Sequence, residues 1–176
     1  MFTLVIGGAA SGKSGYAEGL VLASPHRPRY YIATMEPLDG EARRRVEKHR
    51  GMRADKRFET VECYTNLASV HLSGRGTVLL ECIGNLSANE LYSPKGAGNR
   101  ADAAAAIVDG VEALLSQCGD LVVVSNEVFT GGADYAGGTE DYLRLVAEVN
   151  RTLAARADRV CEVVCGLPRF YRGAAG

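Results

Sequence analysis

Residues 2–14 read FTLVIGGAASGKS, and this stretch decides the fold of the chain. Its apolar beginning, 2–6, predicts a buried β-strand. The remainder matches G-x-x-x-x-G-K-S, a pattern whose glycines let backbone N–H groups surround phosphate oxygens while the following helix points its positive end at them. An ordinary glycine-rich turn is the alternative, but such a turn would not need a lysine. We expect the phosphate-binding residues to be Gly7, Gly8, Ala9, Ala10, Ser11, Gly12, Lys13 and Ser14.

Short apolar runs alternate with helical patterns along the rest of the chain. This alternation predicts an α/β fold, in which helices cover a doubly wound, mainly parallel sheet. The expected strands are 2–6, 29–34, 58–62, 77–82, 121–125 and 159–165. The expected helices are 13–22, 40–50, 101–118 and 139–157. We expect mobile loops at 93–99, at 131–138 and in the tail after Gly166.

Composition limits the possible functions. The chain has 176 residues, of which 47% are hydrophobic and 23% charged, which is typical of one domain, here 1–176, with its own core. A net charge of -1 argues against general affinity for nucleic acid or membrane surfaces. No apolar stretch is long enough to span a bilayer, so we expect a cytoplasmic protein. The five cysteines stand mostly in apolar segments, as buried free thiols do, and the spacing of Cys161 and Cys165 does not predict a zinc site.

Polar residues follow two of the apolar strands. Glu81 closes the run TVLLE, and Asn126 and Glu127 follow the run LVVVS. Ligands of α/β proteins gather beyond the carboxyl ends of the strands, where a carboxylate can hold the Mg²⁺ that bridges nucleotide phosphates. We therefore expect Ser14 and Glu81 at a metal position. The alternative is that Glu81 merely ends a strand and that Asn126 and Glu127 fix a loop.

Residues 43–57 concentrate positive charge in a nearly neutral chain. They include eight basic and two acidic residues, a net charge of +6, which suits a triphosphate. On helical spacing His49 shares a stripe with Ala42 and Val46. A satisfied core histidine on a solvated basic helix is the ordinary interpretation. A catalytic nucleophile is the other, because clustered cations disfavour imidazolium and hold a triphosphate nearby, and this would add nucleotidyl transfer to phosphorylation.

Several further motifs occur in a fixed order after the phosphate loop. They are YIAT at 31–34, RVEKHR at 45–50, TVE at 60–62, LEC at 80–82, SNEV at 125–128 and VVCGLP at 163–168. In this combination the chain resembles, over nearly its whole length, the bifunctional adenosylcobinamide kinase and adenosylcobinamide-phosphate guanylyltransferase family of cobalamin biosynthesis.

The resemblance implies a RecA-like P-loop fold and a trimeric transferase. Such an enzyme phosphorylates adenosylcobinamide with ATP or GTP and then adds GMP from GTP. The resemblance also implies that His49 takes up GMP as a phosphoramidate, and that Lys13 and Ser14 serve phosphoryl transfer with Mg²⁺. A carboxylate can accept two hydrogen bonds from the guanine edge, and the sequence leaves open whether Glu62 or Glu81 does so. Further nucleotide contacts are implied for Ala33, Thr34, Met35, Arg50, Gly51, Met52, Arg53, Glu62 and Glu81.

The chain departs from the family pattern in three places. Family members usually carry arginine where this chain has Ala10, and residues 129–138 of this chain stand in place of the family's usual segment that contains glycine and proline. The tail residues 169–172 have no counterpart in the family pattern. On the residues alone two other functions stay open. One is a small-molecule P-loop kinase without nucleotidyl transfer, in which His49 is structural. The other is a GTP-dependent switch that regulates a partner.

Overall fold

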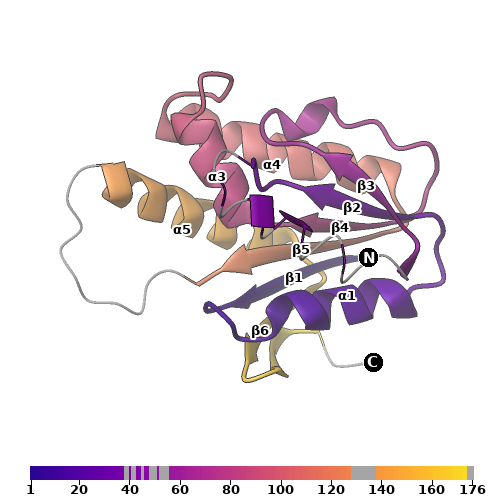
Figure 1. Ribbon diagram of the computed structural model, residues 1–176. Coiled ribbons are helices and arrows are strands. Elements are labelled where there is room, and N and C mark those ends of the chain that lie inside the picture. The colour runs from indigo at the N-terminus through magenta and orange to yellow at the C-terminus, as the bar shows by residue number, and fades with distance from the viewer. Residues whose placement is uncertain are drawn as a thin grey trace.

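The computed structural model describes residues 1–37, 40, 43, 44, 46, 47, 51, 56–127 and 138–173. Within them the chain forms a seven-stranded sheet of order β3-β2-β4-β5-β1-β6-β7 (Figure 1). The strands are β1 (Phe2–Gly7), β2 (Arg29–Ala33), β3 (Phe58–Glu62), β4 (Thr77–Glu81), β5 (Asp120–Asn126), β6 (Arg159–Val164) and β7 (Leu167–Arg172). All neighbouring pairs are parallel except β6 with β7. The predicted α/β fold with a mainly parallel sheet is confirmed.

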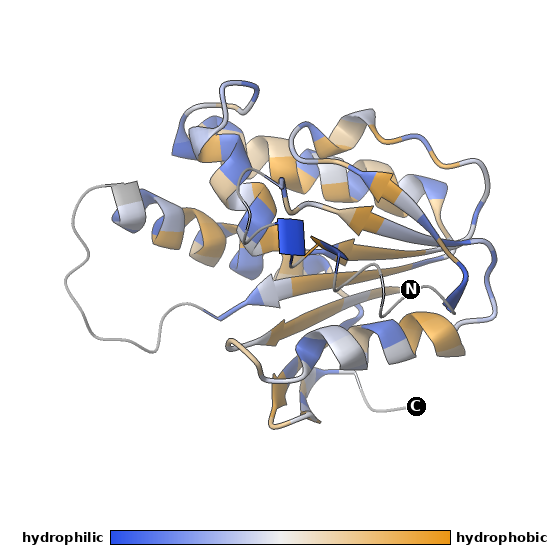
Figure 2. Cartoon of the chain, in the orientation of Figure 1, coloured by the Kyte–Doolittle hydropathy of each residue, from blue (hydrophilic) through white to orange (hydrophobic). Residues whose placement is uncertain are grey.

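Helices lie on both faces of the sheet (Figure 1). One face is packed by α1 (Lys13–Ala23), and the other by α3 (Ile83–Tyr92), α4 (Arg100–Gln117) and α5 (Gly138–Arg156). A single 3₁₀ turn, η2 (Leu67–Ser69), packs against α4. Strand residues alternate between the two cores: Leu4 faces α3 to α5, and Val5 faces α1. Figure 2 shows the hydrophobic residues concentrated along the strands, as expected for strands covered on both faces.

Besides the single turn η2, two elements of the described chain were not predicted. The prediction of a mobile tail after Gly166 is wrong, because Cys165 and Gly166 adopt positive φ angles of 50° and 81° and turn the chain back. That turn lets β7 pair with β6 as an antiparallel hairpin. The helix α3 was missed because its buried positions include Ser87 and Glu90, so no apolar period marks it.

The remaining predictions differ little from the structure. Predicted strand and helix ends agree with the observed ones to within two residues where the chain is described. The segment 93–99 connects α3 to α4 without regular secondary structure, which confirms the predicted loop, and its mobility stays a prediction. The predicted helix 40–50 falls on a segment that lies mostly outside the described residues, and so does the predicted loop at 131–138, except for Gly138 at the start of α5.

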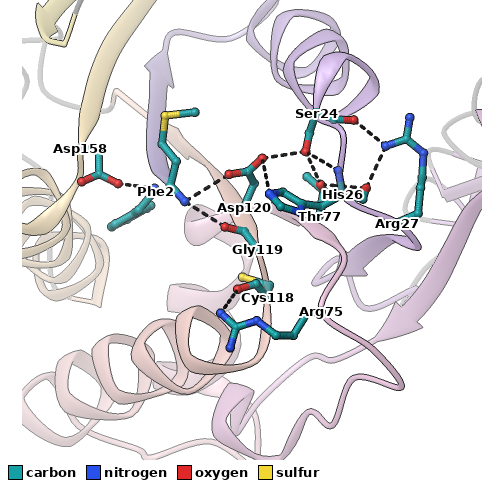
Figure 3. Close-up of polar contacts among 11 residues, drawn as sticks. Phe2, Ser24, His26, Arg27, Arg75, Thr77, Cys118, Gly119, Asp120 and Asp158 are labelled. Atoms are coloured by element: carbon teal, nitrogen blue, oxygen red, sulfur yellow. Dashed lines mark hydrogen bonds and ion pairs between the residues drawn. The ribbon is translucent and has the colours of Figure 1, made fainter.

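A polar network ties the amino ends of the central strands to the end of α1 (Figure 3). The Ser24 hydroxyl donates to Asp120 Oδ2 over 2.6 Å and lies 2.6 Å from Thr77 Oγ1. The amino group of Met1 lies 3.1 Å from Asp120 Oδ1. Burial raises the pKa of Asp120, but hydrogen bonds from Ser24 and the amino group, together with the positive charge of that group, outweigh it and hold the pKa below its ordinary value.

The lowered pKa makes the contribution of Asp120 dependent on pH. It is complete above the ordinary carboxyl pKa and is lost as the pH falls through the folded-state value. We expect D120N to lower the free energy of unfolding by about 1 kcal/mol at neutral pH, with the difference from wild type shrinking towards pH 3. Urea unfolding across this range, with D109N on the exposed side of α4 as control, measures the effect. A penalty that does not change with pH would contradict it.

Candidate active site at the carboxyl edge of the sheet

The loop between β1 and α1 has the form of an anion cradle. Gly12 caps the start of α1 with a φ of 90°, a conformation that favours glycine. The next residue, Lys13, is 9% exposed, and its ammonium donates to the carbonyl of Gly8 over 3.0 Å. The lysine therefore folds back over the loop that precedes it. The first turn of any helix has N–H groups without partners inside the helix, and with this ammonium they are the groups of the loop that suit a phosphate.

The hairpin of β6 and β7 holds this loop from outside. The amide of Gly166 donates to the carbonyl of Ser11 over 2.8 Å. A Cβ at Gly12 would lie 3.0 Å from Gly166 Cα, and one at Gly7 would lie 2.8 Å from the Val163 carbonyl. Larger residues would therefore push the loop off the hairpin. The hydroxyl of Ser11 is buried and has no hydrogen-bond partner within the described part of the chain. A phosphate oxygen bound in the loop would supply that partner.

Ser14 and Glu81 lie together beside the cradle. Ser14, in the first turn of α1, donates its hydroxyl to Glu81 Oε1 over 2.6 Å. Glu81 is the last residue of β4, and its second oxygen accepts a 2.6 Å bond from the hydroxyl of Tyr31. No cluster of three or more His, Cys, Asp or Glu side chains suited to a metal occurs among the described residues. One hydroxyl and one carboxylate suit Mg²⁺, which takes its other ligands from phosphates and water.

A cleft opens beside this pair, at the carboxyl ends of β2, β3 and β4. The ladders that align these ends pair Ala33 with both Glu62 and Glu81. The cleft brings together five residues that were expected at the nucleotide: Ala33, Thr34, Met35, Glu62 and Glu81. It also contains five that were not: Tyr31, Val46, Thr60, Tyr64 and Asn85.

Thr34 lines the cleft, but its hydroxyl bonds to backbone groups. Its hydroxyl lies 2.9 Å from the Glu81 carbonyl and 3.0 Å from the Cys82 carbonyl, and it accepts the amide of Cys82 over 2.7 Å. The residue is fully buried. Its side chain therefore holds the floor of the cleft, behind Glu81, and does not offer its hydroxyl to a ligand.

Side chains of α3 hold the cleft walls. The Asn89 amide donates to the carbonyls of Thr34 and Tyr64 over 2.8 and 2.9 Å. The Tyr64 hydroxyl in turn donates to Glu62 over 2.9 Å, on the opposite side of the cleft from Glu81. The missed helix is therefore what joins the end of β2 to the segment after β3. The sequence could not predict these contacts of Asn89, because a single asparagine within a helix does not indicate which backbone groups it will meet.

The basic segment is only partly described. His49, Arg50, Met52 and Arg53 lie outside the described residues, and Gly51 is exposed. Two residues that flank them are placed: Val46 lines the cleft, and Lys56 forms an ion pair with the buried Glu18 of α1. The segment is thus joined to the molecule on the side of the sheet where the cleft and α1 lie.

Asn126 ends β5 and Glu127 follows it, and β5 lies between the strands that carry the phosphate loop and Glu81. The amide of Glu127 donates to the Gly7 carbonyl over 3.1 Å. Burial raises the pKa of Tyr142 on α5, and a hydrogen bond with Asn126 lowers it again in part. Both residues thus lie at the carboxyl edge next to the phosphate loop, as expected from their place after an apolar strand.

This fold and site define a P-loop nucleotide-binding protein with RecA-like strand order. Solved structures agree on the fold: the flagellar accessory protein FlaH from Methanocaldococcus jannaschii has a TM-score of 0.50 at 11% identity, covering 97% of this chain and 77% of its own. An ATPase domain also has a TM-score of 0.50, at 9% identity over 92% of this chain and 68% of its own.

The chain belongs to the cobinamide kinase / cobinamide phosphate guanyltransferase family, whose model matches residues 3–170. The bifunctional adenosylcobalamin biosynthesis protein CobU of Salmonella typhimurium is 35% identical, over 95% of this chain and 97% of its own length. The protein CobP of Pseudomonas aeruginosa, described in the same words, is 32% identical over 98% of both. No helix within the described ranges is long and apolar enough to cross a membrane.

The contact of Gly12 with the hairpin leads to a test. We expect G12A to weaken nucleotide binding at least about tenfold, because a Cβ is strained at this φ and presses on Gly166. G19A is the matched control, since Gly19 is exposed on the same helix with open space around it. Titration with a fluorescent GTP analogue measures both. Equal affinities of the two variants would show that the loop tolerates displacement.

Proposed function

We propose that this chain catalyses two consecutive steps of cobalamin biosynthesis. It phosphorylates the free hydroxyl of adenosylcobinamide with ATP or GTP, and it then transfers GMP from GTP to the new phosphate, which gives adenosylcobinamide-GDP. Membership of the family supports the pair of activities. The observation that carries the first step is the Ser14–Glu81 hydrogen bond in the helix turn that also carries Lys13, because a hydroxyl, a carboxylate and an ammonium together suit a phosphate and its metal ion.

In the first step the chain's own residues hold the triphosphate in line with the acceptor. Lys13 and the amides of the loop neutralise and orient the β- and γ-phosphates. Ser14 and Glu81 would hold Mg²⁺, which when bound neutralises charge that develops on the phosphate oxygens. Tyr31 donates to the second oxygen of Glu81 and so fixes which oxygen faces the phosphates. The oxygen of the substrate hydroxyl forms a bond to the γ-phosphorus and its proton passes to solvent, as the bridging oxygen departs with the nucleoside diphosphate.

The second step needs a nucleophile, and we assign it to His49. Its imidazole nitrogen attacks the α-phosphorus of GTP, pyrophosphate leaves, and GMP remains bound to the ring through a phosphorus–nitrogen bond. The phosphate of the acceptor then displaces the imidazole. Support comes from the position of Val46, three residues earlier, in the cleft, and from the positive charge of 43–57.

The cleft also suggests how guanine is recognised. Both oxygens of Glu81 accept hydrogen bonds, from Ser14 and from Tyr31. Glu62 is on the far wall and is aligned by Tyr64. We therefore assign the guanine edge to Glu62 and the metal position to Glu81, which separates the roles that the sequence left open.

We further propose one domain, a cytoplasmic location and a trimer. The single domain is supported by the sheet, whose strands β1 and β7 come from opposite ends of the chain. The trimer and the location follow from resemblance to the family. Light scattering at micromolar concentration tests the oligomeric state.

Removal of the ammonium should abolish the first step. We expect K13A to lower the rate of cobinamide phosphorylation at least about 100-fold, because a charge that meets the β- and γ-phosphates is lost, while circular dichroism stays that of the folded protein. K95A, on the exposed loop after α3, is the control and is expected to act as wild type. Near wild-type kinase activity in K13A would show that the loop does not bind the transferred phosphate.

Replacement of His49 should remove guanylyl transfer and leave phosphorylation in place. After incubation with GTP labelled at the α-phosphate, we expect wild-type protein to retain label that survives base and is lost in acid, as a phosphorus–nitrogen bond to imidazole requires. H49A should lose this label and guanylyl transfer and keep kinase activity to within about threefold, since phosphorylation uses other residues. H71A is the control.

Three other outcomes have clear meanings. Undiminished label in H49A would place the nucleophile elsewhere. Wild-type protein without acid-labile label but with phosphorylation of cobinamide would be a kinase alone. Stoichiometric GTP binding without either turnover would indicate a switch.

A further inference from the structure

A second cavity lies at the carboxyl edge of the sheet, outside the nucleotide cleft. It is a groove of about 600 Å³ between α5, the start of α4 and the end of β1. Its apolar part comes from Ile6, Ala147 and Ala154, and its polar rim includes Arg100, Arg144 and Arg151. The proposed chemistry of the phosphate loop and the nucleotide cleft uses none of these residues.

The groove adjoins the phosphate loop from the opposite face of the sheet. Ile6 packs towards the core under α3 to α5, whereas α1 and the loop leading to it lie on the other face. The residue after Ile6 is Gly7, whose carbonyl accepts the amide of Glu127, and Glu127 also lines the groove. A ligand in the groove would therefore lie at the end of β1, on the face of the sheet opposite the phosphate loop.

The shape of the groove is set by one side of α5. Leu145, Val149 and Leu153 turn into the core. Ala147 and Ala154 line the groove, where their small side chains leave space, and Ala154 also packs against the core. Asn150 lies between them and is held rigidly, because its Oδ1 accepts from Ser125 over 2.6 Å and its amide donates to the Asn126 carbonyl over 3.3 Å. The wall is thus a fixed surface connected to the end of β5.

Most of the positive charge of the rim is paired with carboxylates, which bears on the kind of ligand. Arg100 lies 3.1 Å from Glu148, Arg144 pairs with Glu140, and the rim contains the carboxylate of Glu127. Such a rim is poorly suited to a polyanion. It does suit neutral groups that both accept and donate hydrogen bonds, above all amides, whose carbonyls accept from guanidinium and whose N–H groups donate to carboxylate.

We propose that this groove binds the corrin macrocycle of the acceptor. A corrin is a large, flat, mostly apolar ring with a rim of carboxamide side chains, so the apolar floor would pack on the ring, and the arginines and Glu127 would bind its amides. The size is within the range of small-molecule sites, which leave part of a larger ligand exposed. This inference rests on the proposed function, and it adds the place where the acceptor is held.

A macrocycle site makes a prediction that a nucleotide site does not. Cobinamide and cobinamide phosphate have the same ring, so the groove must serve both steps, and a change in it should raise both corrinoid KM values by the same factor. The nucleotide is held elsewhere, so its KM should stay constant. A phosphate site would instead affect cobinamide phosphate or the nucleotide selectively.

The test compares variants that fill the groove or remove its donors. A147F fills it, and A155F, exposed on the same helix outside the groove, is the matched control. R151A removes a donor, and R156A, which pairs with Glu112 away from the groove, is its control. We expect A147F to raise the corrinoid KM of both steps at least about tenfold and R151A about threefold or more, with the KM for GTP within about twofold of wild type. R151A keeps the test valid if A147F does not fold.

Three results would overturn the proposal. A raised KM for GTP with unchanged corrinoid KM would make the groove a nucleotide site. A change of oligomeric state on light scattering would show that a second copy covers it. Wild-type corrinoid KM values in both variants would show that the acceptor binds elsewhere.

Equilibrium dialysis with cobinamide, detected by its visible absorbance, separates this proposal from the proposed function. If wild type binds cobinamide without turnover and A147F binds it at least about tenfold more weakly, the groove assignment stands and the enzymatic assignment fails. If wild type does not bind cobinamide, both fail.

Discussion

The hydrogen bond between Ser14 and Glu81 joins residues that are 67 positions apart in the chain, and the site depends on it. It can form only if α1 begins right after the short phosphate loop that follows β1, and if β4, two strands away, ends level with that point. The register that pairs Glu81 with Val124, and that carries β5 on to pair Asn126 with Gly7, sets this level. The register of these parallel strands therefore places the Glu81 carboxylate beside the phosphate loop.

The sequence could predict the parts of this arrangement that are marked locally. The strands β4 and β5 are continuous apolar runs because both of their faces are covered, and Glu81 stood out because it closes such a run. The phosphate loop has its own pattern. By contrast, α3 buries Ser87 and Glu90 among its apolar residues, and β7 exposes Leu167 and Tyr171, so neither has the alternation by which an element is recognised.

The cleft residues that the sequence did not predict share one physical cause. Tyr31, Thr60 and Asn85 are ordinary in their own segments, and they meet only because β2 pairs with β3 on one side and β4 on the other. Thr34 shows the converse, since its position was expected but its hydroxyl is used to connect strand ends. Local patterns therefore identify the chemistry of single residues, whereas register decides which of them share a cavity.

The contact of the β6–β7 turn with the phosphate loop has a consequence for how the molecule can be shortened. The amide of Gly166 and the carbonyl of Val163 bear directly on the loop, so the C-terminal hairpin is a buttress for the P-loop as well as an edge of the sheet. A fragment that ended before this turn would keep all four helices described here and still lack the support under its phosphate cradle. Loss of the last strands would thus lower the affinity for the triphosphate before it affected the rest of the fold.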